Sequence, residues 1–179
     1  SVTGVQTCAL PISGIIITTQ REMFFYMSLL SQQLPIESQF INSLVDSLNA
    51  EVVIRNIRSI EDGVRWLAMT YYYVCSLRSP KLYGISDEDL EGDPTLERRR
   101  RDLIHTAATI LHKHGLIIYD KRKGTMSATE LGRIASYYYL TYNTIQSMND
   151  TLKRGATDID MINIFSHSSE FKYLKIGRA

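Results

Sequence analysis

The stretch from Asp93 to Thr129 limits the possible folds most, because residues that typically begin or end helices and strands follow one another closely in it. Asp93-Pro94 predicts the start of a helix, since aspartate can cap a first turn and proline costs nothing at the first helical position. Gly115 predicts the end of that helix. Whatever follows must therefore begin directly after Gly115.

A hairpin is predicted at this point. Residues 116–119 and 125–128 read as short strands, and the basic segment 120–124 between them reads as a turn. Thr129 then predicts the start of another helix. A helix followed at once by a two-stranded wing and a further helix is the order of a winged-helix domain. We therefore expect a mainly α chain built around a winged helix.

Further elements are predicted before this segment. Apolar residues at helical spacing predict a helix over 36–48, and Ser59 predicts the N-cap of a second helix that ends before Pro80. Residues 51–54 are a candidate strand, and 79–92 reads as a loop rich in acidic side chains.

The flanks of this domain have a different character. The β-branched run 14–19 predicts a buried strand that needs partners elsewhere, and 21–32 predicts a helix that stops before Pro35. Beyond Tyr139, apolar helical patterns separated by polar breaks predict the start of a small helical bundle.

Both ends of the chain resemble sequencing adapters. Residues 2–12, VTGVQTCALPI, look like the in-frame translation of a common short-read adapter, and 175–179, KIGRA, look like that of its partner. We expect residues 1–13 and 176–179 to be foreign to the natural protein, and the remainder to be a slice of a longer one.

Composition argues against several classes of protein. With 20 Lys and Arg against 19 Asp and Glu, the chain has a net charge of +1 and no bulk field that attracts polyanions. Its 2 cysteines provide neither a disulfide framework nor zinc-ligand spacing, which fits a reducing compartment. The apolar runs are too short for a membrane span or a secretory signal, so we expect no membrane partner.

The sequence carries no catalytic motif. It has no phosphate-binding glycine loop and no Asp-Glu-x-His box, so we expect no ATP hydrolysis and no bound cofactor in this piece. The acidic segment 87–89 is better explained by solvation than by a metal, because consecutive residues do not converge on one ion. His112 and His114 lie two apart on a helix, unlike helical zinc ligands. We expect no metal site and structural roles for the histidines.

Positive charge is concentrated in two clusters. They are Arg98-Arg99-Arg100-Arg101 on the helix before the wing and Lys121-Arg122-Lys123 at the wing turn. Both positions of a winged helix can meet phosphates. The arginines are explained equally well as a solvated or domain-bridging face paired with acids such as Glu97 and Asp102, and the wing cations as plain turn residues. We predict Arg98, Arg99, Arg101, Lys121, Arg122 and Lys123 as contacts to nucleic acid or to another domain.

Two tyrosine triplets, 71–73 and 137–139, could stack nucleobases. Three successive helical residues spread around most of a helix, however, so such triplets more often pack against two neighbouring layers. We expect them to mark helices sandwiched between domains.

Five short sequence segments, taken together, are distinctive enough to suggest a protein family. They are QQLPIES at 32–38, LNAE at 48–51, LYGIS at 82–86, DLIHTAA at 102–108 and TELGRIAS at 129–136. They resemble the Ski-two-like DExH RNA helicases of superfamily two, most closely the active amino-terminal cassette of the spliceosomal branch. The related cointegrator-complex helicases and the second, inactive cassette stay open as alternatives.

This resemblance implies a division of the chain. Residues 14–34 would end the second RecA-like motor domain, 35–136 would form the winged helix, and 137–175 would open the helical bundle.

The resemblance also implies a nuclear, spliceosomal protein that uses ATP and magnesium, with RNA, other helicase domains and spliceosomal proteins as partners. The ATPase motifs of such helicases lie upstream, so this fragment would supply scaffold around single-stranded RNA and would be inactive alone. The alternative is a stand-alone winged helix that binds nucleic acid or serves as a protein adaptor.

Overall fold

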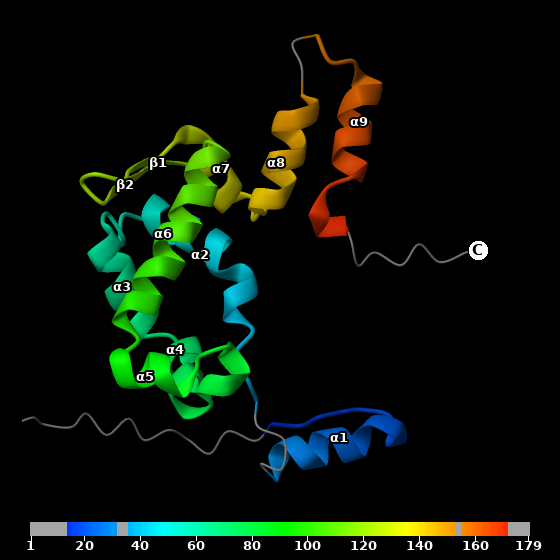
Figure 1. The fold of residues 1–179 in the computed structure, drawn as a ribbon. Helices are drawn as coiled ribbons and strands as arrows, with labels where there is room; N and C mark the ends of the chain where they lie inside the picture. Colours follow the sequence, from blue (N-terminus) through cyan, green and yellow to red (C-terminus); the bar gives the residue numbers. More distant parts are fainter. Residues whose placement is uncertain (1–13, 32–35, 153–154, 172–179) are drawn as a thin grey trace, which may run out of the picture. The chain divides into compact units, whose positions relative to one another are not determined.

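The computed structural model describes residues 14–31, 36–152 and 155–171 (Figure 1). The chain divides into two compact units, residues 1–37 and 38–179, and each is considered by itself. The two segments expected to be adapter translations, 1–13 and 176–179, lie outside the described residues.

The first unit contains one described helix, α1 (Gln20–Leu30), which confirms the helix expected over 21–32. The strand expected over 14–19 is not formed, and Ile15 and Ile17 are 85% and 94% exposed. That prediction was wrong because a β-branched run becomes a strand only when a neighbouring strand pairs with its backbone, and no described segment does so.

The second unit is mainly helical, as expected (Figure 1). In chain order its elements are η1 (Phe40–Ser43), α2 (Leu44–Val53), α3 (Ile60–Ala68), α4 (Tyr71–Arg78), η2 (Pro80–Tyr83), α5 (Asp87–Gly92), α6 (Glu97–Lys113), β1 (Ile117–Asp120), β2 (Thr125–Ala128), α7 (Glu130–Tyr137), α8 (Tyr142–Thr151), α9 (Asp158–Ser166) and η3 (Ser169–Phe171).

The predicted hairpin is confirmed. Strands β1 and β2 are antiparallel, with Ile117 opposite Ala128 and Asp120 opposite Thr125. The turn closes at Gly124, whose φ of 67° lies in the left-handed region that glycine adopts without strain. Helix α6 ends at Lys113, just before Gly115, and Thr129 caps α7 by accepting a hydrogen bond from the N–H of Gly132, so both of these predicted signals are confirmed.

The core lies between α2, α3, α6 and the hairpin. Its fully buried apolar side chains include Leu48, Leu67, Ile104, Leu111, Leu116 and Ile117. Helices α3 and α6 approach closely at Gly63, where a Cβ atom would lie 2.7 Å from Cγ2 of Ile104. This packing fixes α6 beneath the hairpin and so determines where its basic side chains point.

Several predictions upstream of α6 need correction. The helix expected over 36–48 is a short 3-10 turn, η1, followed by α2, which begins at Leu44 and runs on to Val53. Residues 51–54 do not form a strand, because they continue α2 and no described strand lies beside them. The single helix expected after Ser59 is two helices, because Thr70 ends α3 and caps α4 through a hydrogen bond from the N–H of Tyr73. The Ser59 cap itself is confirmed as a capping box with Asp62.

The segment 79–92 is also more ordered than a loop. It contains η2 and the short helix α5, which begins with a capping box between Ser86 and Asp89. The acidic residues that suggested a solvated loop therefore lie in the first turn of a helix, where the positive end of the helix dipole stabilises them.

The last part of the second unit is the expected start of a helical bundle. Helices α8 and α9 contact each other, and η3 contacts α8. Ile145 on α8 and Ile164 on α9 are buried, whereas Ile159, Ile162 and Phe165 on α9 are 71%, 66% and 63% exposed. One face of α9 is therefore largely exposed, although Phe165 on it packs edge-to-face on Phe171.

Candidate nucleic-acid and interdomain interface

The first turn of α6 is capped by Asp93, three residues before its formal N-cap. The carboxylate accepts hydrogen bonds from the N–H groups of Glu97 at 3.0 Å and Arg98 at 2.7 Å. Pro94 is consequently not the first helical residue, and Leu96 bridges the gap with a φ of 52°. Burial opposes ionisation of Asp93, but these backbone hydrogen bonds outweigh it and lower the pKa of the carboxyl group. The helix start thus depends on an ionised aspartate.

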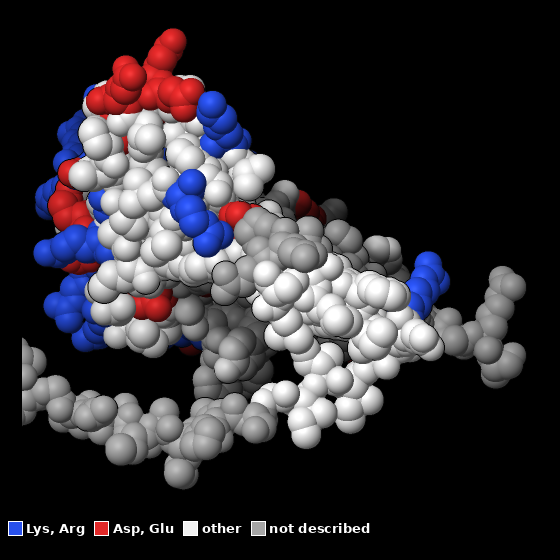
Figure 2. Space-filling view, turned by 90° about the horizontal axis from the view of Figure 1, so that it is seen from below, with Lys and Arg blue, Asp and Glu red and all other residues white. Residues whose placement is uncertain are grey.

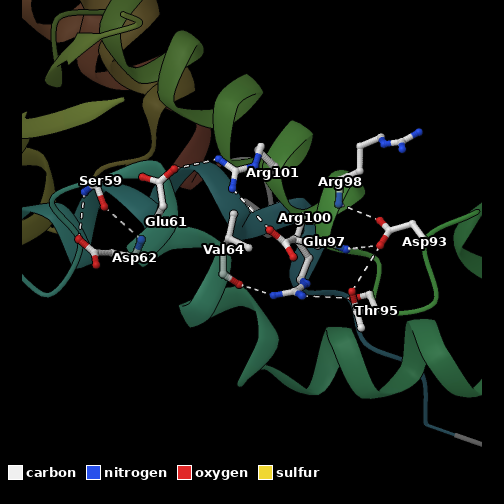
Figure 3. A network of polar contacts seen from close by, with 10 residues as sticks. All are labelled: Ser59, Glu61, Asp62, Val64, Asp93, Thr95, Glu97, Arg98, Arg100 and Arg101. Carbon is white, nitrogen blue, oxygen red and sulfur yellow. Dashed lines mark hydrogen bonds and ion pairs between the residues drawn. The ribbon is translucent and has the colours of Figure 1, made fainter. Parts of the chain in front are cut away.

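Arg100 is a buried structural cation (Figure 3). Its guanidinium donates to the carbonyl oxygen of Val64 on α3 at 2.7 Å and to that of Thr95 at 3.2 Å. The same group lies over the ring of Tyr73 on α4, 4.8 Å from the ring centroid. Arg100 therefore ties together α3, α4 and the segment before α6.

Arg99 and Arg101 also make contacts within the unit. Arg99 donates from Nη2 to the carbonyl oxygen of Tyr83 in η2 at 2.6 Å. Arg101 pairs with Glu61 on α3 at 2.9 Å and with Glu97 one turn earlier on α6 at 3.5 Å. The hydrogen bond from Arg101 lowers the pKa of the Glu61 carboxyl group. Both arginines are thus occupied in holding α6 against its neighbours.

Arg98 differs from the other three arginines. Its guanidinium extends to solvent and bonds to none of the described residues, although its backbone N–H binds Asp93 (Figure 3). The run that reads as one exposed basic turn is therefore divided, with three side chains directed at the protein and one left for an external contact.

The three wing cations form the second predicted cluster. Lys121, Arg122 and Lys123 are all exposed, and the carboxylate of Asp120 accepts hydrogen bonds from the N–H groups of Arg122 at 2.9 Å and Lys123 at 3.2 Å. These bonds fix the backbone of the turn and leave the cationic side-chain ends in solvent.

Two further arginines, which the sequence analysis did not select, lie beside the wing. The loop between α2 and α3 is bound to β2, since the N–H of Met126 donates to the carbonyl oxygen of Arg58 at 2.7 Å. Arg58 in turn donates from Nε to the carbonyl oxygen of Arg55 at 3.4 Å. No local signal places this loop against the hairpin, so only the tertiary structure reveals Arg55 and Arg58 as neighbours of the wing.

A groove of about 520 Å³ runs along α6 on the side of η1, α2 and α5. Its apolar part includes Ile41, Val45, Leu103 and Ile110, and its charged part includes Glu88, Asp89, Asp93, Asp102, Arg98 and Arg99. Acidic side chains gather at one end of the face shown in Figure 2. Helix α5, which lines the groove, carries Asp87, Glu88 and Asp89 in its first turn. This face of α6 therefore has mixed charge with an acidic end, unlike the wing.

The two tyrosine triplets have different surroundings. In the first, Tyr72 is 3% exposed and packs edge-to-face on Tyr83, while Tyr73 contacts Arg100. In the second, Tyr137, Tyr138 and Tyr139 are 77%, 66% and 88% exposed. Tyr72 and Tyr73 of the first triplet thus pack within this unit while Tyr71 is 50% exposed, and the second triplet offers aromatic surface at the junction of α7 and α8.

The histidines have ordinary structural surroundings. His105 packs edge-to-face on Tyr119, and His112 lies with Nδ1 3.3 Å from the N–H nitrogen of Tyr119. Among the described residues no group of three or more His, Cys, Asp or Glu side chains could hold a metal ion. Nor does any described helix have the length and apolarity to cross a membrane.

The start of α8 is held by carboxylates from two other elements. Asp46 on α2 accepts from the N–H of Tyr142 at 2.7 Å, and Glu170 in η3 accepts from the N–H of Thr141 at 2.8 Å. The buried hydroxyl of Thr144 donates to Glu170 at 2.5 Å. The winged helix and the bundle therefore meet through a defined polar joint.

The two carboxylates of this joint have opposite pKa shifts. Burial raises the pKa of Asp46, with a further contribution from Glu170 and despite the hydrogen bond from Tyr142. Burial also opposes ionisation of Glu170, but hydrogen bonds from Thr141 and Thr144 outweigh it and lower the pKa. Relative to ordinary carboxyl groups, the fold therefore makes Asp46 harder to ionise and Glu170 easier to ionise.

We expect Asp46→Asn to gain stability relative to the parent chain as pH rises above the ordinary aspartate pKa of about 4. A raised carboxyl pKa contributes stability at low pH that is lost as pH rises through the folded-state pKa, and asparagine keeps the acceptor for Tyr142 without the charge. Urea unfolding below and above this pH measures the difference. Asp150→Asn, at an exposed position of α8, is the control, and a constant offset at every pH for Asp46→Asn would contradict the expectation.

Two known domain families match the chain. The Winged Helix-turn-helix domain family matches residues 37–113, and the Sec63 Brl domain family matches residues 128–178. The first covers the helices from η1 to α6, and the second begins at the end of the hairpin and covers the bundle.

Similar proteins match nearly the whole chain. This chain is 52% identical over 163 residues to the U5 small nuclear ribonucleoprotein 200 kDa helicase of Homo sapiens, and the matched region is 91% of this chain and 8% of that protein. It is 52% identical over 159 residues to an activating signal cointegrator 1 complex subunit 3-like protein of Dictyostelium discoideum, covering 89% of this chain and 7% of that protein. It is 50% identical over 163 residues, with coverages of 91% and 8%, to the DExH-box ATP-dependent RNA helicase DExH12 of Arabidopsis thaliana. The chain thus spans less than a tenth of these relatives, and it belongs to the family of DExH RNA helicases that includes the U5 small nuclear ribonucleoprotein 200 kDa helicases.

Proposed function

We propose that this chain is part of an ATP-dependent RNA helicase of the spliceosome, in which it is a scaffold around single-stranded RNA. The observation that carries the proposal is the identity of 52% to the U5 small nuclear ribonucleoprotein 200 kDa helicase over 91% of this chain. The nucleus is the corresponding location. ATP and magnesium would act in motor domains that precede this segment.

In the proposed arrangement, residues 14–34 end a RecA-like motor domain, 35–136 form the winged helix and 137–175 open the helical bundle. Exposed apolar surfaces support the presence of covering domains, because large contiguous apolar patches seldom face water. On α1, Phe24, Met27 and Leu30 are 70%, 56% and 73% exposed. The exposed face of α9 and the tyrosines 137–139 are surfaces of the same kind.

The six predicted contact residues divide into two groups under this proposal. Arg99 and Arg101 stabilise the scaffold, because their guanidinium groups bond to η2 and α3. Arg98, Lys121, Arg122 and Lys123 extend to solvent and are the candidates for RNA or for a neighbouring domain.

The test is the natural sequence upstream of residue 14. We expect it to encode a phosphate-binding glycine loop and an Asp-Glu-x-His box, and a recombinant protein with both motor domains should hydrolyse ATP with stimulation by RNA. The chain of 179 residues should show no turnover above that of a buffer blank. An upstream sequence without helicase motifs would end the proposal.

A further inference from the structure

We propose that Arg55, Arg58, Lys121, Arg122 and Lys123 form one site that binds RNA through its phosphates, here called the wing edge. The inference rests on the proposed function for the choice of RNA as the ligand. It adds a binding site formed jointly by the wing turn and the loop between α2 and α3. The loop and the turn are far apart in sequence but lie side by side at the start of α3 (Figure 1).

Backbone contacts hold the two parts of the wing edge in a fixed relation. Ser59 forms an antiparallel bridge with Thr125, and the N–H of Ile60 donates to the carbonyl oxygen of Gly124 at 2.9 Å. The bond from Met126 to the carbonyl oxygen of Arg58 extends this ladder by one residue. The loop therefore lies against β2 as a short third strand, with Arg58 opposite Met126 and Ile60 beside the turn at Gly124. The cations of the loop and those of the turn thus follow one another along this edge of the hairpin.

Arg55 occupies a backbone position that favours glycine. It has a φ of 63°, and its N–H bonds to the carbonyl oxygen of Val52 while that of Asn56 bonds to Glu51. This is the Schellman pattern that ends many helices, and glycine is its usual residue because a Cβ atom is strained in the left-handed region. A charged side chain at a strained, exposed position supports a use of the charge outside the fold.

The charge of the wing edge is not neutralised within the unit. Among the described residues none of its five cations forms an ion pair, and all five are exposed. The nearby acids have other partners, since Asp62 pairs with Arg65, Glu51 accepts from Asn56, and Asp120 accepts from the backbone of the turn. In a chain with a net charge of +1, such a local cluster is what can attract a polyanion.

The chemistry of the edge fits phosphates rather than bases. The single aromatic ring in residues 54–60 and 117–128 belongs to Tyr119, which is 5% exposed and cannot stack on a base. Arginine and lysine without an aromatic platform recognise the backbone of nucleic acid and not its sequence. We therefore expect binding that depends strongly on salt and weakly on sequence.

The experiment measures fluorescence anisotropy of labelled oligouridylate RNA with the full chain over a series of salt concentrations. Five phosphate contacts to a single strand predict a slope of log affinity against log salt of about −3.5, from about −0.7 per contact. The double variant Arg55→Gly, Arg58→Gln should reduce the slope by about 1.4 and weaken binding at low salt about tenfold. Because Arg55→Gly removes the strained side chain, its melting temperature should be no lower than that of the parent.

Arg133→Gln, which removes one positive charge at an exposed position of α7, is the control and should leave the slope unchanged. If the parent binds RNA and the double variant has the same slope of log affinity against log salt, the wing edge is not an RNA site, and the proposed function is unaffected. If the parent shows no salt-dependent RNA binding, the wing edge is also overturned, and the proposed function is then judged by the upstream sequence. Equal binding of polyglutamate would reassign the edge to an acidic protein surface and likewise overturn the RNA site.

Discussion

Arg100→Leu is expected to destabilise the second unit by about 2–3 kcal/mol, although the residue lies in the middle of a run of arginines. The substitution removes the hydrogen bonds to the carbonyl oxygens of Val64 and Thr95 and the contact with the ring of Tyr73. Leucine fills part of the space but cannot satisfy either carbonyl, and buried acceptors without a donor are costly. Three elements would lose their common attachment at once.

Chemical unfolding followed by circular dichroism measures this effect. Arg98→Leu is the matched control in the same helix, and we expect its stability to lie within about 0.5 kcal/mol of the parent, since its exposed guanidinium forms no hydrogen bond or ion pair with the described residues. Arg100→Lys keeps the charge but cannot donate to two carbonyls from a planar fork, so it should lie between these variants. Equal losses for Arg98→Leu and Arg100→Leu would show that Arg100 is not the attachment described here.

The difference between these two arginines could in part be anticipated from the sequence. Arg100 falls on the apolar stripe of α6, four residues after Leu96 and four before Ile104, both of which are buried. Arg98 falls on the opposite side. Grouping the four arginines as one cluster counted charges and overlooked the rotation of about 100° per residue of an α-helix. What no local pattern provides is the identity of the acceptors, since Val64 belongs to another helix.

The elements that were predicted correctly carry their signals locally. Gly115 and Thr129 each mark an end of the hairpin region within one or two residues, and the hairpin forms where they indicate. The predictions of strands over 14–19 and 51–54 were wrong because a strand cannot be predicted from a local signal alone. Strand formation requires a partner, and neither segment has one among the described residues, so β propensity alone was misleading.

The candidate site shows the same division between local and tertiary information. The wing cations were identified because charge and turn residues are adjacent in the sequence. Arg55 and Arg58 were not, because the bridge between Ser59 and Thr125 spans residues far apart in the chain. The polar joint at α8 was also missed, since Asp46 and Glu170 come from segments at opposite ends of the second unit.

Gly132→Ala is expected to cost about 4 kcal/mol or more and to prevent the second unit from reaching its native packing. An added Cβ atom would lie 2.0 Å from the carbonyl oxygen of Leu116 and 2.9 Å from Oδ1 of Asn49. The Leu116 oxygen cannot move away, because it accepts hydrogen bonds from both the N–H and the hydroxyl of Thr129. Helix α7 would therefore have to leave the hairpin, and the bond from Asn49 to the carbonyl oxygen of Gly132 would break.

Two further variants make this expectation decisive. Gly92→Ala places a Cβ atom where nothing lies within 4 Å, so its stability should stay within about 0.5 kcal/mol of the parent. Asn49→Ala combined with Gly132→Ala should not restore stability, because the closest clash is with backbone and the asparagine is only the second obstacle. Urea unfolding and near-ultraviolet circular dichroism of the three variants provide the comparison. A Gly132→Ala chain that unfolds within about 1 kcal/mol of the parent would mean that α7 can move away from β1 at little cost, and the link from the winged helix to the bundle through α7 would then be flexible instead of rigid.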